Sequence, residues 1–199
     1  MKNIKNIEAV EKIEVVEPVI VVGFNSGKKE LIEFYPEFIL NENQHQGTTK
    51  KNLVVELKKN FPKVKFSVKK EFNDCYSVTW FESVTIEEVD NVVRKFIDHQ
   101  NDESGDFRDY NPTNFNRFFG GFKFISTYRN FGDSKKLLLE ELGQLMGDDN
   151  KNYPNNISDT LYRLLRKTSF PIGAKVIGIK NNDNFKGGNI EDSFIIIFE

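Results

Sequence analysis

The sequence predicts an α+β fold, in which helices pack on a small antiparallel or mixed sheet. Two observations carry this prediction. Several short runs alternate apolar and polar residues, and other runs repeat apolar residues every three or four positions. The chain has 199 residues, of which 38% are hydrophobic and 29% charged. This length and balance are typical of one soluble folded unit that needs neither a metal nor a disulfide to hold its core.

The strongest local pattern begins a helix–strand–strand–helix–strand core. A helix is expected from Thr48 or Thr49, either of which can cap it, to about Asn60. Two strands follow over 63–69 and 76–80, where every second residue is apolar or aromatic. The core therefore begins with a helix that precedes a pair of half-buried strands.

The second half of this core has equally local signals. Thr85 and Glu88 form a capping box, which predicts a helix to about residue 97. A strand is then expected within 118–129, with Phe122, Phe124 and Tyr128 as its members. Segment 98–112 between them is polar and acidic, and we expect it to be a loop.

At the N-terminal side, the sequence predicts a β hairpin. Its strands would be Glu11–Val22 and Leu31–Leu40, around a turn at Gly23–Gly27. Residues 41–47 are polar and resemble a linker. We therefore expect this hairpin to extend the core.

At the C-terminal side, we expect two helices and a closing hairpin. Asp133 and Ser158 can cap the helices, and the strands would be 175–179 and 193–198, joined by the Asn- and Gly-rich connection 181–189. Within one folded unit, the chain then divides into three parts: 1–47, 48–131 and 132–199.

Composition excludes several classes of protein. No apolar run reaches the length needed to cross a bilayer, and the charged N-terminal stretch is not expected to be a secretory signal. The single Cys75 cannot form an internal disulfide, which favours a cytoplasmic location. One Cys and two His cannot build the usual structural zinc sites, and we expect no cofactor.

The stretch Gly23–Lys29 has a superficial likeness to a phosphate-binding loop. A P-loop has four residues between its glycines and a Ser or Thr after its lysine, whereas Gly23 and Gly27 are separated by three residues and Lys29 follows Lys28. We therefore expect a turn here rather than a nucleotide site.

Charge is distributed unevenly along the chain, although the net charge is only -2. Segment 48–71 has eight Lys and two Glu, and lysines at 63, 65 and 69 alternate with apolar residues along one strand. Such a lysine face can bind phosphates, or it can be an ordinary solvated surface. The residues that would form a nucleic-acid site are Lys63, Lys65, Lys69, Arg117 and Arg129.

Segment 115–131 mixes aromatic residues with cations, a pattern typical of single-strand binders. Part of it is similar to an RNA-recognition signature, but Lys123 and Thr127 occupy positions where that signature has a small residue and an aromatic residue. Core packing accounts for the phenylalanines more simply, because Phe is the main aromatic residue of this chain.

The acidic segment is the one cluster with metal-ligand chemistry, but its spacing matches no calcium loop. An exposed acidic loop is the simpler interpretation, and it can contact a partner by imitating phosphates against a basic channel. Its acidic residues are Asp98, Asp102, Glu103, Asp106 and Asp109. An enzyme is supported only by the neighbourhood of His99 and Asp106, with no catalytic motif.

Residues 52–129 resemble a large polyvalent protein-associated domain. The resemblance rests on KKNLVVELKKNFPKVKFSVKKEF, YSVTW, TIEEVDNVVRKF and FFGGFKFISTYR. It departs at 71–74, which lacks glycines, and at 80–83, which lacks a Gly-Pro before the helix. The resemblance implies a helix packed on a short sheet, and a phage or conjugative element as the setting. It carries over no catalytic residue.

The leading hypothesis is a non-enzymatic mobile-element protein that binds a macromolecule of the bacterial host. The partner would be a host protein or ribonucleoprotein complex, such as a CRISPR effector or another defence nuclease. A nucleic-acid-binding module on the lysine face is the alternative, and an uncharacterised enzyme is the third hypothesis. We expect no membrane partner, and the sequence indicates no oligomeric state.

Overall fold

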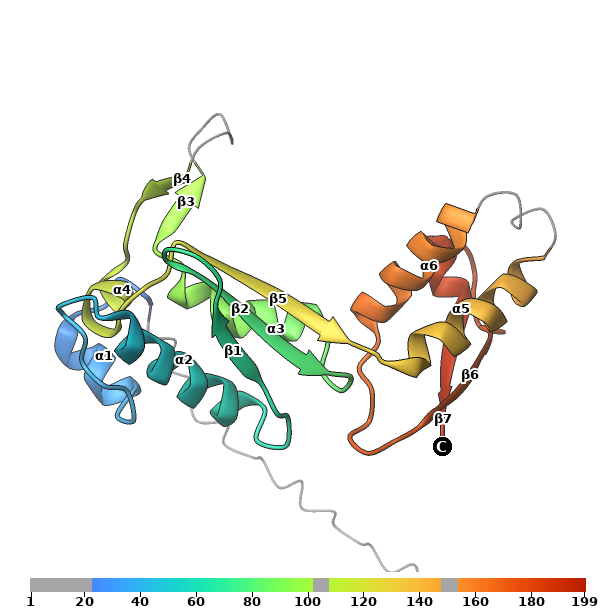
Figure 1. Cartoon of the computed structure of the whole chain (residues 1–199), viewed down its shortest axis with the longest axis horizontal. Helices are drawn as coiled ribbons and strands as arrows, with labels where there is room; N and C mark the ends of the chain where they lie inside the picture. Colours follow the sequence, from blue (N-terminus) through green and yellow to red (C-terminus); the bar gives the residue numbers. More distant parts are fainter. Residues whose placement is uncertain (1–22, 102–107, 148–153) are drawn as a thin grey trace, which may run out of the picture.

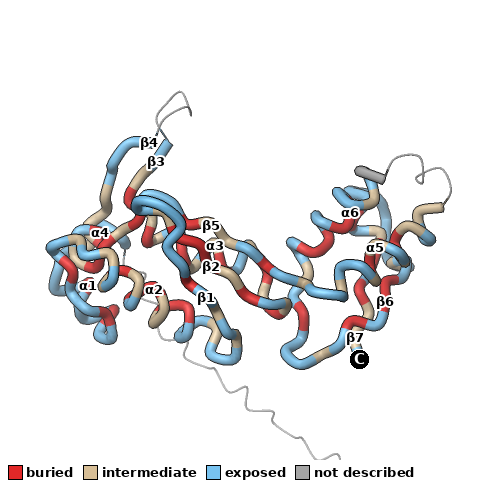
Figure 2. Tube along the Cα trace, in the orientation of Figure 1, coloured by how far each residue is buried: buried red, intermediate tan, exposed pale blue. Residues whose placement is uncertain are grey.

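Buried apolar side chains form two clusters, the first within residues 31–125 and the second within 138–196. The computed structural model describes residues 23–101, 108–147 and 154–199. Each cluster is the core of one lobe, and the two lobes lie end to end in an elongated molecule (Figures 1 and 2). The helices and small sheets confirm the predicted α+β class.

The first lobe contains a mixed sheet of three strands. β1 (Ser67–Lys70) pairs antiparallel with β2 (Cys75–Phe81), and β2 pairs in parallel with β5 (Phe124–Asn130). The strand order is β1-β2-β5, so β2 lies in the centre. The three strands that the sequence predicted in this core are all present, although β1 and β5 begin later than expected, and Phe122 lies before β5 in an isolated bridge with Ile97.

Two helices cover one face of this sheet, α2 (Gln46–Asn60) and α3 (Ile86–Val93). The predicted capping box at α3 is confirmed: Thr85 Oγ1 accepts a hydrogen bond from Glu88 N, and Glu88 Oε2 accepts one from Thr85 N at 2.7 Å. The core side chains of this layer are Leu53, Leu57, Val68, Tyr76, Val78, Trp80, Val89, Val93 and Ile125. A short 3-10 helix, η1 (Arg94–Phe96), continues α3.

The predicted N-terminal hairpin is wrong in its second strand. Residues 11–22 lie outside the described residues, but Leu31–Leu40 contains the helix α1 (Lys28–Phe34). Leu31, Tyr35 and Phe38 are buried together, and their spacing of four and three is helical rather than alternating. The turn predicted before them is present, since Ser26 N donates to Gly23 O at 2.9 Å.

Segment 41–47 is not a linker, and neither Thr48 nor Thr49 caps α2. The helix begins at Gln46, and the buried side chain of Asn41 bridges its first turn. Asn41 Oδ1 accepts from His45 N, and Asn41 Nδ2 donates to Thr49 Oγ1, each at 2.8 Å. Segment 41–47 instead folds back onto the start of α2, because the buried side-chain amide of Asn41 forms hydrogen bonds with polar groups at the N-terminus of this helix.

The acidic segment is not simply a loop. β3 (His99–Asn101) and β4 (Arg108–Tyr110) form an antiparallel hairpin in its described part. A further helix, α4 (Asn114–Phe119), follows, and the sequence analysis missed it. Its signal was present as another capping box, in which Thr113 Oγ1 accepts from Asn116 N and Asn116 Oδ1 accepts from Thr113 N.

In the second lobe, α5 (Asp133–Met146) and α6 (Pro154–Lys167) pack on the hairpin of β6 (Val176–Asn181) and β7 (Phe194–Phe198). The closing hairpin is therefore confirmed. Ser158 does not cap its helix, because α6 begins at Pro154, where a proline is well accommodated. No helix in the described part of the chain is long and apolar enough to cross a membrane.

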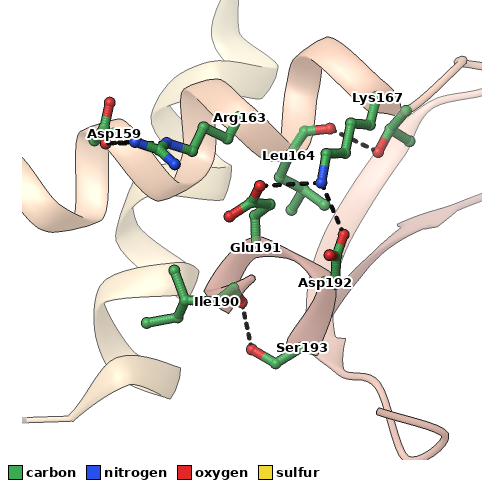
Figure 3. Close-up of polar contacts among 9 residues, drawn as sticks. Asp159, Arg163, Leu164, Lys167, Ile190, Glu191, Asp192 and Ser193 are labelled. Carbon is green, nitrogen blue, oxygen red and sulfur yellow. Dashed lines mark hydrogen bonds and ion pairs between the residues drawn. The ribbon is translucent and has the colours of Figure 1, made fainter. Parts of the chain in front are cut away.

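A polar cluster attaches the 3-10 helix η3 (Ile190–Ser193) to α6 (Figure 3). Lys167 Nζ lies 3.0 Å from a carboxylate oxygen of both Glu191 and Asp192. The pKa of Glu191 is lowered by its own backbone N–H and by Lys167. Segment 181–189, predicted as a hairpin loop, thus leads into a helix that the end of α6 holds in place.

Candidate nucleic-acid interface

The three-stranded sheet leaves the face opposite α2 and α3 without a covering helix among the described residues. Strand alternation and register place one set of side chains on this open face. They are Ser67 and Lys69 of β1; Cys75, Ser77, Thr79 and Phe81 of β2; and Phe124, Ser126, Tyr128 and Asn130 of β5. Most of the larger members are exposed, as the tube in Figure 2 shows for the strand ends.

Three aromatic rings on the open face are accessible to solvent. Phe81 is 59% exposed, Tyr128 is 56% exposed and Phe124 is 37% exposed. Phe124 and Tyr128 are about 13 Å apart along β5, from the usual rise per strand residue. The small side chain of Ser126 lies between them. Large rings separated by small polar residues form a surface on which planar groups can stack.

Cations lie beside these rings. Lys69 is on the open face itself, and Lys65 precedes β1 with the same alternation. Lys63, Lys65 and Lys69 are all exposed, and none forms an ion pair with a described residue. The guanidinium carbon of Arg108, on β4, lies 4.6 Å from the ring centroid of Phe124. The three lysines are therefore available to a ligand, whereas Arg108 already contacts the ring of Phe124.

One carboxylate shares the open face. Glu71 Oε1 accepts a hydrogen bond from Ser77 Oγ at the centre of the sheet. Lys69 and Arg108 outnumber this carboxylate at the open face, and Lys65 continues the alternation of β1, although the whole chain is slightly acidic. The open face thus combines stacking rings, hydroxyl groups and cations.

Two arginines predicted for this interface lie elsewhere. Arg117 is exposed, but it belongs to α4, which contributes no residue to the open face. Arg129 points into the covered side of the sheet and is only 7% exposed, so its assignment to a nucleic-acid surface is wrong. Its guanidinium donates to the carbonyl oxygens of Ser83, Leu165 and Thr168 at 2.7, 2.6 and 2.8 Å.

The residues of the predicted acidic site differ in burial, and only some of them are described by the structure. Asp98 is buried, Asp98 Oδ1 lies 2.6 Å from Nδ1 of His99, and its carboxylate packs against Gly121. Asp98 therefore supports the hairpin and is not a surface charge. Asp109 is exposed on β4, and Asp102, Glu103 and Asp106 lie outside the described residues. Among the described residues, no group of three His, Cys, Asp or Glu side chains could hold a metal ion.

The aromatic-rich segment 115–131 has two roles in the structure. Phe115, Phe119 and Phe122 are fully buried, which agrees with the core interpretation. Phe124 and Tyr128 are exposed on the open face, which agrees with the interpretation of this segment as a surface that binds a single strand. The sequence analysis missed Phe81 and Arg108 as members of this surface. Alternation with Trp80 indicates the orientation of Phe81, whereas no local signal places Arg108 beside Phe124.

Comparison with known proteins confirms the resemblance found in the sequence. Residues 44–132 match the family model described as large polyvalent protein associated domain 29. Domains of this kind are associated with polyvalent proteins of phages and mobile elements. The match includes β1, β2 and β5, and with them the whole open face. Searches of curated proteins and of solved structures found no match.

Proposed function

We propose that this chain is a non-enzymatic accessory protein of a mobile genetic element, and that it binds single-stranded nucleic acid on the open face. The observation that carries the proposal is the exposed set of Phe81, Phe124 and Tyr128 beside the exposed Lys65 and Lys69. The mobile-element setting is supported by the domain match over residues 44–132.

A single strand fits this surface better than a duplex does. Unpaired bases can stack on exposed rings, and this stacking tolerates any sequence because every base has a π-face. Paired bases are stacked on one another and cannot reach these rings. Lys65 and Lys69 lie on or just before β1 and Arg108 lies beside β5, so cations flank the rings where a sugar-phosphate backbone would run.

Fluorescence anisotropy with labelled single-stranded RNA and DNA tests the proposal. Replacing Phe124 or Tyr128 with alanine is expected to weaken binding by about tenfold each, because each change removes one stacking platform. Replacing Lys65 or Lys69 with alanine is expected to reduce the slope of log affinity against log salt by about 0.7 for each phosphate that the variant no longer neutralises.

Matched controls are available on elements that contribute nothing to the open face. Lys51→Ala and Lys58→Ala remove the same charge from the exposed surface of α2, and Phe34→Ala removes an exposed ring from α1. These variants should bind as the unchanged protein does. The proposal fails if no complex forms at low salt, or if the open-face and control variants bind equally.

A second candidate function is counter-defence through the β3–β4 hairpin. We propose that the hairpin contacts a basic surface of a host defence protein, such as a CRISPR effector nuclease. The hairpin projects from the first lobe in Figure 1, and it presents the exposed Asp109. Acidic side chains on a projecting element can occupy a positively charged groove that normally receives nucleic acid.

Interference with CRISPR immunity in a defended bacterium tests this second candidate. Expression of the chain should reduce immunity, and Asp109→Lys should restore it because the new charge repels a basic surface. Glu140→Lys, which makes the same exchange on the exposed surface of α5, should leave the inhibition unchanged. Full immunity in cells that contain the folded chain would exclude this role in that host.

A further inference from the structure

A cavity of about 420 Å³ lies where the two lobes meet. Its walls come from the end of β5, the start of α5 and one side of α6. The lining residues with polar or aromatic side chains are Arg129, Asn130, Phe131, Lys135, Tyr162 and Arg166. Its volume lies within the range of small-molecule sites in proteins.

The cavity wall contains three cations and no carboxylate among the described residues. Lys135 is exposed and has no ion pair with a described residue. Arg166 contacts Tyr162, whose hydroxyl lies 3.3 Å from Nη1. By contrast Arg163, three residues earlier on α6, does not line the cavity and is already paired with Asp159. The cations facing the cavity are therefore the ones without acidic partners in the described part of the chain.

Arg129 adds a buried charge behind this wall. Its hydrogen bonds all go to carbonyl oxygens, and its Nε is buried without a partner among the described groups. Burial lowers its pKa to about 10, so it still carries a positive charge at neutral pH. Glu88 and Glu82 act on this charge through space and offset part of it, but neither is hydrogen-bonded to the guanidinium, so Arg129 still adds positive potential to the space beside it.

The start of α5 also forms part of the cavity wall. Its N-cap is Gly132, which has a positive φ of 50° and provides no side chain to cap the helix. Ser134 N donates to Phe131 O at 3.1 Å, and Ser134 Oγ donates to Glu82 Oε1 at 2.6 Å, so one carboxylate already contacts the first turn, whose N–H groups have no side-chain cap. Asp133 belongs to this turn but does not line the cavity.

We infer that this cavity binds a nucleoside monophosphate or a closely similar phosphorylated ligand. Lys135 and Arg166 would hold the phosphate, because both line the cavity and neither forms an ion pair with a described residue. The rings of Phe131 and Tyr162 would contact the planar base. This site shares only Asn130 with the open face, so its occupancy does not depend on oligonucleotide binding there.

Isothermal titration calorimetry of the full chain with AMP tests the inference. AMP should bind, inorganic phosphate should bind more weakly, and adenosine should not bind. Lys135→Ala and Arg166→Ala should each weaken AMP binding by about tenfold or more, because each removes a charge-assisted contact. Tyr162→Ala should weaken AMP binding more than phosphate binding, because it removes a ring that contacts the base as well as the hydroxyl that contacts Arg166.

Lys136→Ala is the matched control, since Lys136 is the exposed neighbour of Lys135 on α5 and does not line the cavity. It should bind AMP as the unchanged protein does. Absence of AMP binding at millimolar concentration would overturn the inference. A double variant with Lys135→Ala and Arg166→Ala that binds AMP as tightly as the unchanged protein would also overturn it. Circular dichroism would verify that the variants, all at exposed positions, remain folded.

Discussion

Replacing Arg129 with methionine is expected to lower the free energy of unfolding by about 2–4 kcal/mol, because the carbonyl oxygens of Leu165 and Thr168 lose a donor and that of Ser83 keeps only Phe170 N. Two of them, of Leu165 and Thr168, belong to the end of α6, where helix carbonyls have no partner within the helix. The third belongs to Ser83, at the turn that leads into α3. One side chain of the first lobe therefore connects both lobes.

Packing adds to the effect of the missing hydrogen bonds. The guanidinium of Arg129 lies against the rings of Phe131 and Phe170, which also contact each other, with its carbon 4.7 and 4.6 Å from their centroids. Methionine keeps much of the length of the side chain but cannot donate or stack in this way. Because burying the charge is itself costly, the net loss should be smaller than the sum of the individual interactions.

Urea unfolding followed by two probes measures this change. Trp80 is the single tryptophan and lies in the core of the first lobe, so its fluorescence reports on that lobe, whereas far-ultraviolet circular dichroism reports on both lobes. In the Arg129→Met variant, we expect the two transitions to separate as the lobes uncouple. Arg163→Met, at an exposed ion pair on α6, should change the unfolding free energy by less than about 0.5 kcal/mol. A loss below about 1 kcal/mol at Arg129, the upper limit for a surface ion pair, would contradict its role.

Arg129 also illustrates what sequence analysis could not provide. Its neighbours in the chain are aromatic and polar, a context typical of a nucleic-acid surface. Its hydrogen-bond partners are 36 to 46 residues away, on elements whose positions depend on the tertiary fold. By contrast, the capping box at Thr85 and Glu88 was predicted correctly because both partners lie within one helical turn.

The same distinction applies to the candidate interface. Alternation predicted that Lys63, Lys65 and Lys69 would be exposed, and the structure places all three at the surface. The alternating pattern likewise predicted that Phe124 and Tyr128 belong to a strand. It did not show that α2 and α3 would both cover the other face of the sheet and leave these two rings exposed. The error at Leu31–Leu40 arose because a short apolar run satisfies strand composition and helical spacing together.

Replacing Gly120 with alanine is expected to cost about 3 kcal/mol or more, the sum of backbone strain and overpacking. Gly120 ends α4 with a φ of 90°, a conformation that side chains rarely adopt. A Cβ there would lie 2.0 Å from Thr49 Oγ1 and 2.5 Å from Asn41 Nδ2. These two groups are hydrogen-bonded to each other at the start of α2, so neither can move freely.

The Gly173→Ala variant distinguishes backbone strain from overpacking, because Gly173 has a similar φ of 82° and open space where its Cβ would be. This control should lose only about 1 kcal/mol, which is the backbone strain alone. Thermal or urea unfolding of both variants provides the comparison, and equal losses would show that the contact with Thr49 is unimportant.

A double-mutant cycle with Thr49→Ala isolates the contact itself. The Thr49→Ala substitution removes the hydroxyl oxygen that would lie nearest to the new Cβ. The double variant should therefore lose less free energy of unfolding than the two single variants lose in sum. Rescue should be partial because Asn41 Nδ2 remains within 2.5 Å. Gly120 would then be required because α4 and the start of α2 approach too closely for any side chain. That approach positions the turn into β5, and with it the strand that presents Phe124 and Tyr128.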